Sequence, residues 1–553
     1  MLRLTEIKLP LAHAENALQE ALLHLLQIAP DDLASFTVFK RSFDARKAVI
    51  MQVYIVDVEL VDATLETALL AQHAGHPHIF PTPDMAYHPV GSAPASLPLR
   101  PIVVGFGPCG IFAALVLAQM GFKPIVLERG KTVRERTKDT WGLWRKNVLN
   151  PESNVQFGEG GAGTFSDGKL YSQIKDPRHL GRKVMNEFVK AGAPADILYE
   201  AHPHIGTFKL VKVVENLRAQ IIALGGEIRF QQRVTDVLIE GSADNQHIRG
   251  LTVLDQATGQ THELRADDVV LALGHSSRDT FAMLHERGVY VEAKPFSIGF
   301  RVEHPQGLID RARWGRHAGD PSLGAAEYKL VHHASNGRSV YSFCMCPGGT
   351  VVAATSEAGR VVTNGMSQYS RNERNANAGI VVGIDPRDYP GSPLAGIDLQ
   401  RQLESHAFVL GGGNYEAPGQ LVGDFVAGRA STGLGEVMPS YQPGVAMGDL
   451  SSALPGYAIE AIREAFPAFG QKIKGFDRHD AVLTGVETRT SSPIKMSRGD
   501  DMQSLNVRGL YPAGEGASYA GGILSAGVDG IKVAEAVARS MLEGAESARL
   551  ALA

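Results

Sequence analysis

The segment that most constrains the fold is a strand–turn–helix–strand pattern that starts at Pro101. Its sequence is PIVVGFGPCGIFAALVLAQMGFKPIVLERG, in which Gly105, Gly107 and Gly110 form a G-x-G-x-x-G turn. The first glycine allows the tight turn, the second lets the backbone approach a pyrophosphate, and the third lets helix and strand pack closely. The helix N-terminus adds free N–H groups and a positive dipole end. A bare turn would explain the glycines alone, but the whole pattern predicts a dinucleotide site.

Glu128 supports this interpretation. It ends the second strand of the pattern, 18 residues after Gly110. A carboxylate at this position accepts hydrogen bonds from the ribose hydroxyls of a bound dinucleotide. The same negative charge disfavours a 2′-phosphate, and we therefore do not expect NADP as the main occupant.

The far C-terminus favours FAD over NAD. The sequence Gly514-Glu515-Gly516-Ala517 follows a short strand and precedes a helix near Ile523–Leu542. We expect Glu515 to accept ribityl hydroxyls, and we place Gly522 and Ile523, at the helix start, beside the flavin's pyrimidine edge. A helix cap with a surface glutamate is the alternative. Two halves of a ligand site some 400 residues apart suit the long FAD molecule better than NAD.

Several motifs together resemble a known family. They are Gly105–Gly110 with Glu128-Arg129, the run GEGGAGTFSDGKL, the terminal GLYPAGEGASYAGGILSAGVDG, and the segments YSFCMCPGG and VETRTSSPIK. With these motifs the chain resembles the largely uncharacterised FAD-dependent dehydrogenases, which are related to the glutathione-reductase-like flavoproteins. The resemblance implies an α/β fold with a Rossmann-like FAD-binding domain, FAD as cofactor, and Arg129 beside it. It supplies no substrate.

Two further segments fit a flavin site. In the glycine run, we expect Gly161, Gly163 and Thr164 to offer backbone N–H groups to phosphate or flavin; a flexible surface loop is the alternative. Val234 stands where related flavoproteins place a backbone contact to adenine. Gly274 ends the strand VVLALG and resembles a segment that passes near FAD in those proteins.

Cys344 and Cys346 are the strongest candidates for redox chemistry. A thiolate close to a flavin accepts or relays electrons. The spacing, however, is C-x-C rather than C-x-x-C, and in an extended strand both side chains would share one face. We therefore rank structural or substrate-lining thiols ahead of a redox pair. We expect no metal site, because only Cys109 remains as a further cysteine.

Arg489 and His275 are further catalytic candidates. Arg489 lies in the polar run VETRTSSP and could hold a substrate carboxylate or compensate the charge of a reduced flavin. A strand edge with a solvated arginine explains it equally well. His275 follows Gly274 and could approach the flavin or the substrate, although a histidine after a strand is more often structural.

Length and charge limit the remaining possibilities. The chain has 553 residues, only 3 cysteines and a net charge of −5. Too few cysteines are present for a secretory disulfide framework, and no apolar run approaches the ~18 residues of a membrane span. Residues 1–95 hold 6 basic and 11 acidic residues, and the remaining 458 are balanced. We therefore expect a cytoplasmic protein without membrane contact, and nucleic acid is not an expected partner.

We predict four segments. Residues 1–97 form a small N-terminal α+β domain, 98–290 and 475–545 form a discontinuous FAD-binding domain, and 291–474 form a strand-rich substrate or cap domain. Within the first, strands are expected at Leu2–Leu9, Ser35–Ser42 and Val49–Val61, with a helix over Ala17–Ile28. A longer strand is expected over Glu227–Ile239.

The predicted function is FAD-dependent oxidation or reduction of a small molecule. Only one strand–turn–helix fingerprint is present, so NAD(P)H would bind transiently as a reductant, or electrons would come from another protein. Two alternatives stay open. One is a tRNA- or RNA-modifying flavoprotein that uses residues 1–95 to bind RNA, and the other is a flavin-bound protein that docks partners through its acidic N-terminal unit.

Overall fold

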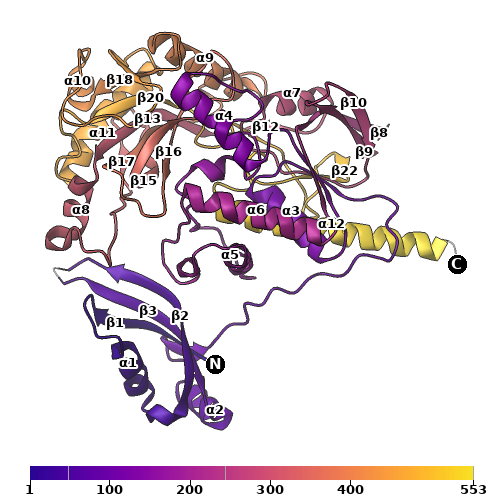
Figure 1. Ribbon diagram of the computed structural model, residues 1–553, viewed down its shortest axis with the longest axis vertical. Helices are drawn as coiled ribbons and strands as arrows, with labels where there is room; N and C mark the ends of the chain where they lie inside the picture. The colour runs from indigo at the N-terminus through magenta and orange to yellow at the C-terminus, as the bar shows by residue number, and fades with distance from the viewer. Residues whose placement is uncertain (48, 243–244, 552–553) are drawn as a thin grey trace. The chain divides into compact units, whose positions relative to one another are not determined.

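The computed structural model describes residues 1–47, 49–242 and 245–551. The chain divides into two compact units. The smaller unit comprises Met1–Tyr87 and Gln173–His204, and the larger unit comprises His88–Ser172 and Ile205–Ala553. Each unit is described by itself below (Figure 1).

The smaller unit is built on a four-stranded antiparallel sheet with two helices. Its elements are β1 (Leu2–Pro10), α1 (Ala17–Leu26), η1 (Pro30–Asp32), β2 (Leu33–Asp44), β3 (Met51–Leu60), α2 (Ala63–Gln72) and β4 (Ile79–Pro81), in the sheet order β2-β3-β1-β4. Alternate residues of the central strands, such as Leu4 and Val56, pack against Leu18 and Leu22 of α1. The expected strands and first helix are present, and α2 and β4 are additional elements.

Residues 173–204 belong to this smaller unit although they lie far along the chain. They carry α5 (Leu180–Lys190) and η3 (Ala195–Leu198). The backbone of Arg41 on β2 exchanges hydrogen bonds with Tyr199 and Ala201. The guanidinium of Arg182 lies 4.6 Å from the ring centre of Phe39. This segment therefore extends the edge of the sheet and packs on its outer side.

The larger unit contains a five-stranded parallel sheet. Its strands are β5 (Ile102–Val104), β6 (Ile125–Glu128), β7 (Glu227–Phe230), β11 (Val269–Leu271) and β23 (Leu510–Pro512), in the order β23-β11-β5-β6-β7. Helix α3 (Pro108–Gln119) packs against α6 (Thr207–Ala223) and α12 (Ile523–Ala551), and the three lie side by side in Figure 1. Helix α3 is apolar on all sides because its neighbours bury every residue from Cys109 to Ala118.

A second, smaller sheet follows directly from the first. It contains β8 (Gln232–Ser242), β9 (Asn245–Asp255), β10 (Thr261–Arg265) and β22 (Val507–Arg508). The single strand expected over Glu227–Ile239 is wrong. Gln231 has a φ of 57°, and this left-handed residue divides the segment into β7 of the parallel sheet and β8 of the second sheet.

Residues 292–490 contain a large mixed sheet. Its strands run in the order β14-β15-β17-β13-β20-β18-β19, with β16 paired to β15. Their bounds are β13 (Phe296–Pro305), β14 (Val331–His333), β15 (Ser339–Ala353), β16 (Thr363–Ser367), β17 (Asn375–Ile384), β18 (Ala417–Leu421), β19 (Val445–Met447) and β20 (Val482–Glu487). Strand β12 (Glu292–Ala293) precedes β13 in the chain, β21 (Ile494–Lys495) follows β20, and the two pair with each other.

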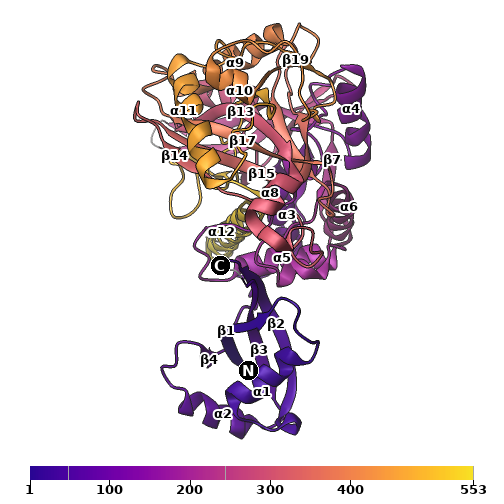
Figure 2. The ribbon, with the colours of Figure 1, turned by 90° about the vertical axis from the view of Figure 1, so that its left-hand side faces the viewer.

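Helices enclose the core of this mixed sheet. They are α8 (Gln306–Trp314), η4 (Gly315–His317), α9 (Ala395–Leu410), α10 (Val422–Ala427) and α11 (Gly456–Lys472). Helix α11 packs across β13, β15 and β17 (Figure 2). The remaining elements are α4 (Val133–Lys146), η2 (Ala162–Phe165) and α7 (Arg278–Glu286). The expected α/β fold, with a Rossmann-like domain, an inserted strand-rich region and a small N-terminal α+β unit, is confirmed. Within the described part of the chain, no helix has the length and apolar character to cross a membrane.

Candidate functional site

Two of the three glycines in the fingerprint turn, Gly105 and Gly110, leave no room for a side chain. Gly105, with a φ of 100°, leaves β5, and a Cβ there would stand 2.5 Å from the carbonyl oxygen of Ala272. A Cβ on Gly110 would overlap the carbonyl oxygen of Gly105. Gly107 caps α3 without a side-chain hydrogen bond. The first N–H groups of the helix are therefore presented by bare backbone, as an anion site requires.

The glycine run packs directly on this turn. The N–H of Gly160 donates to the carbonyl oxygen of Phe106 at 2.8 Å. A Cβ on Gly161, which has a φ of 62°, would stand 2.8 Å from the Cα of Gly107. A Cβ on Gly163 would stand 3.0 Å from the side chain of Ile523, at the start of α12. The run thus connects the N-terminal ends of α3 and α12.

The C-terminal glycines lie next to the same helix start and to the end of the strand that precedes Gly274. Gly514 lies against Cys109, where a Cβ would come within 2.9 Å of the cysteine Cβ. The N–H of Gly516 donates to the carbonyl oxygen of Leu273 at 2.9 Å, and a Cβ on Gly516 would lie 3.1 Å from the carbonyl oxygen of Gly274. Gly522 is exposed at the start of α12. The three glycine-rich segments predicted to meet are therefore adjacent.

Glu128 is buried and holds three backbone N–H groups. Its carboxylate accepts from Phe106 at 2.9 Å, from Gly130 at 2.8 Å and from Gly158 at 3.0 Å. It therefore ties the fingerprint turn to the glycine run. One of its roughly four lone-pair positions is left for a ribose hydroxyl.

Other residues that were predicted to bind the cofactor make contacts within the protein. Arg129 forms ion pairs of 2.9 Å with both Glu152 and Asp279. Val234 lies on β8, and its buried side chain belongs to the core shared with the parallel sheet. Thr164 sits in η2 with its Oγ1 buried and without a hydrogen-bond partner, and its N–H donates to the carbonyl oxygen of Gly161 at 3.2 Å.

Arg136 was not predicted, yet it organises the same region. Its side chain is fully buried. The guanidinium donates to the carbonyl oxygens of Asn154, Val155 and Glu159 at 2.6–2.7 Å. A longer hydrogen bond of 3.3 Å reaches Gly158. In sequence it looks like a solvated residue of the charged helix α4, and no pattern would have distinguished it.

Cys344 and Cys346 do not lie in a regular strand. The register of β15 against β17 shifts between Phe343 and Cys346 and again between Cys346 and Gly349. Cys344 has a φ of 43°. The two cysteines therefore do not share one face of an extended strand, because a bulge displaces the strand at the two thiols. The Cys346 thiol donates a hydrogen bond to the Cys344 carbonyl oxygen, with the sulfur 3.4 Å from that oxygen.

Two cations fix the backbone of this bulge. Arg301, on β13 and fully buried, donates to the Cys344 carbonyl oxygen at 2.9 Å and pairs in bidentate fashion with Glu487. The Lys169 ammonium donates to the carbonyl oxygen of Met345. Neither cation was predicted, since Arg301 and Glu487 are 186 residues apart and meet only in the folded sheet.

A buried charged cluster continues from Lys169. Its members are Asp167, Lys169, Tyr171, Glu327 and Arg371. Burial disfavours the charge on Lys169, but Glu327 and Asp167 nevertheless raise its pKa. The ammonium therefore stays protonated beside the two thiols.

The thiols differ in acidity. The hydrogen bond from Cys346, followed by the positive charges of Arg301 and Lys169, lowers the pKa of Cys344 despite its burial. The same hydrogen bond, together with burial, raises the pKa of Cys346. Cys344 is thus the more acidic thiol, and Cys346 keeps its proton.

Glu515 and His275 form a second titratable pair. Burial, and to a smaller extent the nearby Cys344, raises the pKa of Glu515 to about 7 against the opposing charge of Lys294. The Glu515 side chain is still 32% exposed, so a ligand can reach it. His275 Nε2 lies 3.7 Å from Glu515 Oε1. Burial and the charges of Arg489 and Arg278 lower the pKa of His275 to about 3, which leaves the ring neutral.

Arg489 is held in a buried network. It donates to both oxygens of Glu404, at 3.1 and 3.0 Å, and to the hydroxyls of Ser276 and Ser356. Arg278 pairs with the same carboxylate at 2.6 and 2.9 Å. The catalytic role of Arg489 stays a prediction, and its donors are already engaged. Among the residues described, no three His, Cys, Asp or Glu side chains are arranged to hold a metal ion.

Comparison with known proteins places the chain. The family model "FAD-dependent protein, C-terminal domain-like" matches residues 295–490, which include most of the mixed sheet and Arg489. A domain of unknown function matches residues 1–59. A protein of Clostridium beijerinckii named "Uncharacterized protein" is 47% identical over 538 residues, covering 97% of this chain and 98% of that protein. The chain belongs to this family of FAD-dependent proteins.

Solved structures show a weaker likeness. A flavoprotein/dehydrogenase from Cytophaga hutchinsonii is 12% identical, with 80% of this chain and 79% of that chain covered and a TM-score of 0.35. A geranylgeranyl bacteriochlorophyll reductase-like protein from Thermoplasma acidophilum is 13% identical, with the same coverages and TM-score.

FAD is the cofactor of the family, and the residues present fit it. Two helix N-termini supply backbone donors for a pyrophosphate. In the glycine run between them, the N–H groups of Gly161 and Thr164, which were expected to be donors, already donate to the carbonyl oxygens of Gly158 and Gly161. Side chains at Gly105, Gly110 or Gly161 would fill this cradle.

Proposed function

We propose that the protein is an FAD-dependent oxidoreductase that oxidises or reduces a small molecule. The observation that carries the proposal is the convergence of Gly105–Gly110, Gly161–Gly163 and Gly514–Ile523, which brings two helix N-termini and three bare backbone segments together. Such a surface admits a ligand backbone where side chains would exclude it.

In this proposal different residues bind the two ends of the cofactor. Glu128, with Gly107 and Gly161, would hold the ribose and the pyrophosphate, and the start of α12 with Glu515 would hold the flavin end. The bound flavin supplies the acceptor or donor of a hydride. The chain's own task is to bind, orient and exchange protons.

Glu515 is the residue that we propose for proton exchange. With a pKa of about 7, it both holds and releases a proton near neutral pH. His275 beside it stays neutral and can only orient Glu515 or donate a hydrogen bond. Lys294 completes the pair as a nearby positive charge.

The reductant and substrate are also part of the proposal. After β11 the chain continues as Gly274-His275-Ser276-Ser277, without the glycines of a second fingerprint, which supports transient rather than resident binding of NAD(P)H. A small molecule is favoured over RNA because residues 1–95 carry a net charge of −5.

A comparison of two glycine variants tests the proposal. Wild-type protein should purify yellow with FAD bound and lose its visible absorbance on anaerobic addition of NADH or NADPH. Gly161→Ala should lose at least tenfold in FAD affinity, because the new Cβ meets Gly107. Gly359→Ala is the matched control, since Gly359 has a similar φ of 70° but nothing within 4 Å of its Cβ position. Colourless wild-type protein that takes up no FAD would refute the proposal.

A further inference from the structure

The two thiols of the β15 bulge form an asymmetric pair. Cys344 is partly exposed, whereas Cys346 is completely buried. The Cys346 thiol donates a hydrogen bond to the Cys344 carbonyl oxygen at 3.4 Å, so the two residues are in direct contact. Gly365 of β16 backs the buried thiol, because a Cβ there would lie 3.0 Å from the Cys346 sulfur. One thiol is therefore accessible to a small reactant, and the other is held behind it.

The surroundings of Cys344 favour a thiolate. The charged and titratable groups around it come from several segments: Arg301 of β13, Glu487 of β20, Lys169 of the segment after η2, Glu515 near β23, and Cys346 itself. The bidentate ion pair with Glu487 partly offsets the positive charge of Arg301. Lys169 lies 3.9 Å from each of two carboxylates. A partly exposed thiol in such a polar, cation-containing setting is the usual environment of a reactive cysteine.

The bulge also removes the objection to C-x-C spacing. In a regular strand, residues two apart are separated by about 6.6 Å, at the upper limit for the Cα atoms of a disulfide. Here the left-handed Cys344 and the register shifts on both sides of Cys346 break that geometry. The Cys346 sulfur already lies 3.4 Å from the Cys344 carbonyl oxygen, so the buried thiol is next to the residue that it would attack.

We propose that Cys344 and Cys346 are a redox-active dithiol that reduces small disulfides and closes to a Cys344–Cys346 disulfide. This activity does not rest on the proposed function, because the electrons come from the two thiols.

The reaction balances in two steps. The Cys344 thiolate attacks one sulfur of R–S–S–R, so that a Cys344–S–S–R bond forms and RS⁻ leaves. The proton of Cys346 passes to this RS⁻, and the Cys346 sulfur then attacks Cys344, which forms the intramolecular disulfide and releases a second RS⁻. In sum, one thiolate, one thiol and R–S–S–R give the protein disulfide, RSH and RS⁻, with two electrons transferred.

The test is a single turnover of the FAD-containing full-length protein with oxidised glutathione. Wild type should lose two of its three titratable thiols and two hydrogens of intact mass, and Cys109→Ser should do the same. Cys346→Ser should stop at a mixed disulfide on Cys344, and Cys344→Ser should not react. The proposal is wrong if the native wild type keeps all three thiols while the urea-unfolded chain reacts, or if its mixed disulfide persists.

A second measurement does not depend on the cysteine variants folding. The rate of iodoacetamide modification of Cys344 in the wild type should reach half its maximum below the ~8.5 of an ordinary thiol. Lys169→Gln should move this midpoint upward by about one pH unit. Lys146→Gln, an exposed lysine at the end of α4, should leave it unchanged. A wild-type midpoint at or above that of a free thiol would contradict the proposal.

Discussion

At the scale of single residues, two oppositely charged side chains fix the backbone of the cofactor site. Glu128 accepts from three backbone N–H groups, and Arg136 donates to carbonyl oxygens on the neighbouring stretch of the glycine run. Both are buried, and neither forms an ion pair with another side chain in these hydrogen bonds. Their charges face peptide groups in these hydrogen bonds, and the two side chains also attract each other, because Glu128 raises the pKa of Arg136 against the effect of burial.

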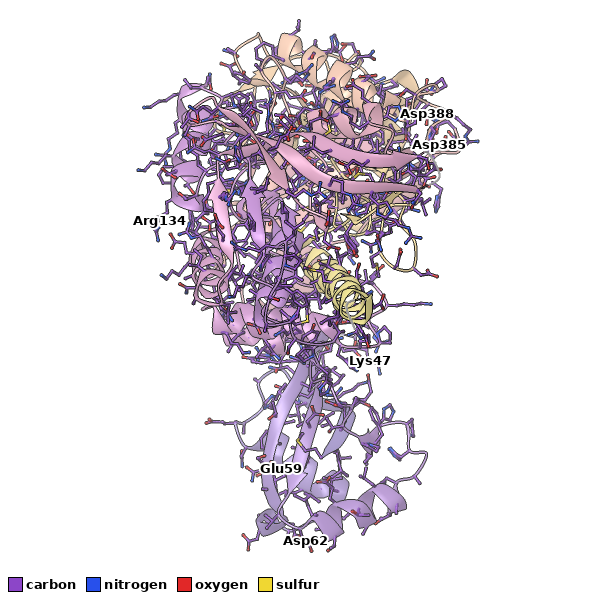
Figure 3. All side chains as sticks on the ribbon, turned by 90° about the vertical axis from the view of Figure 1, so that its right-hand side faces the viewer. Lys47, Glu59, Asp62, Arg134, Asp385 and Asp388 are labelled. Carbon is purple, nitrogen blue, oxygen red and sulfur yellow. The ribbon has the colours of Figure 1, made fainter. Side chains whose placement is uncertain are left out.

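Replacement of Arg136 tests this role. Arg136→Met should lower the free energy of unfolding by about 3–5 kcal/mol, because several buried carbonyl oxygens lose their donors. Urea unfolding measures the change. The control is Arg134→Met on the same helix, where an exposed arginine pairs with Glu215 (Figure 3). A surface pair contributes at most about 1 kcal/mol. Equal losses in the two variants would show that the buried hydrogen bonds are not what stabilises the loop.

The raised pKa of Glu515 predicts that the stability of the fold depends on pH. Its pKa in the fold, about 7, is higher than its ordinary value of 4.5. Between these values the unfolded chain has released the proton and the folded chain still holds it. Stability from this group is therefore complete below about pH 4.5 and falls as pH rises through 7. Relative to Glu515→Gln, FAD-free wild type should lose roughly 1–3 kcal/mol between pH 4.5 and 8. Parallel stability curves for the two proteins would contradict the raised pKa.

At the scale of elements, Glu404 connects parts that are distant in the chain. It projects from α9 to Arg278 at the start of α7 and to Arg489 after β20, and it also accepts from Thr488 at 2.8 Å. His275 lies just before α7, so the orientation of this histidine depends on the network. The network thus couples the mixed sheet to the end of β11.

Glu404→Gln should therefore be strongly destabilising. It removes the carboxylate that both buried arginines share and leaves Glu357, 3.4 Å from Arg278, as the nearby counter-charge; breaking a buried pair in this way costs about 3–5 kcal/mol. Asp398→Asn is the control on the same helix, since Asp398 is exposed in the first turn of α9 and contributes less than about 1 kcal/mol through the helix dipole. Thermal unfolding of both variants measures the difference. A small loss for Glu404→Gln would mean that the arginines find other partners.

The same elements show what sequence could predict. Local, periodic features were accessible: the fingerprint of Gly105–Gly110, the strands of the smaller unit and the helix at the C-terminus. Contacts between distant segments were not. Arg301 meets Glu487 only because β13 and β20 are neighbours in the mixed sheet. The bulge at Cys344 depends on the pairing of β15 with β17. The sequence Cys344-Met345-Cys346 alone does not predict it.

At the scale of the whole molecule, the division into units does not follow chain order. Residues 173–204 leave the larger unit, join the smaller one and return at Ile205. A composition-based boundary cannot detect such an excursion, because the segment has its own helix and an ordinary mixture of residues. All the residues that we assign to FAD, from Gly105 to Ile523, lie in the larger unit. Within the smaller unit, Glu59 and Asp62 lie toward one end and Lys47 toward the other (Figure 3).

This division predicts how FAD changes unfolding. A ligand stabilises only the unit that binds it, by about 2.7 kcal/mol at a hundred times its dissociation constant. Calorimetry should therefore resolve two transitions, and added FAD should raise the one that belongs to the larger unit. Leu22→Ala removes a core side chain of the smaller unit and should lower only the other transition, by about 2–5 kcal/mol in stability. If FAD raised both transitions equally, or if Leu22→Ala lowered both, the two units would unfold as one cooperative body despite their separate cores.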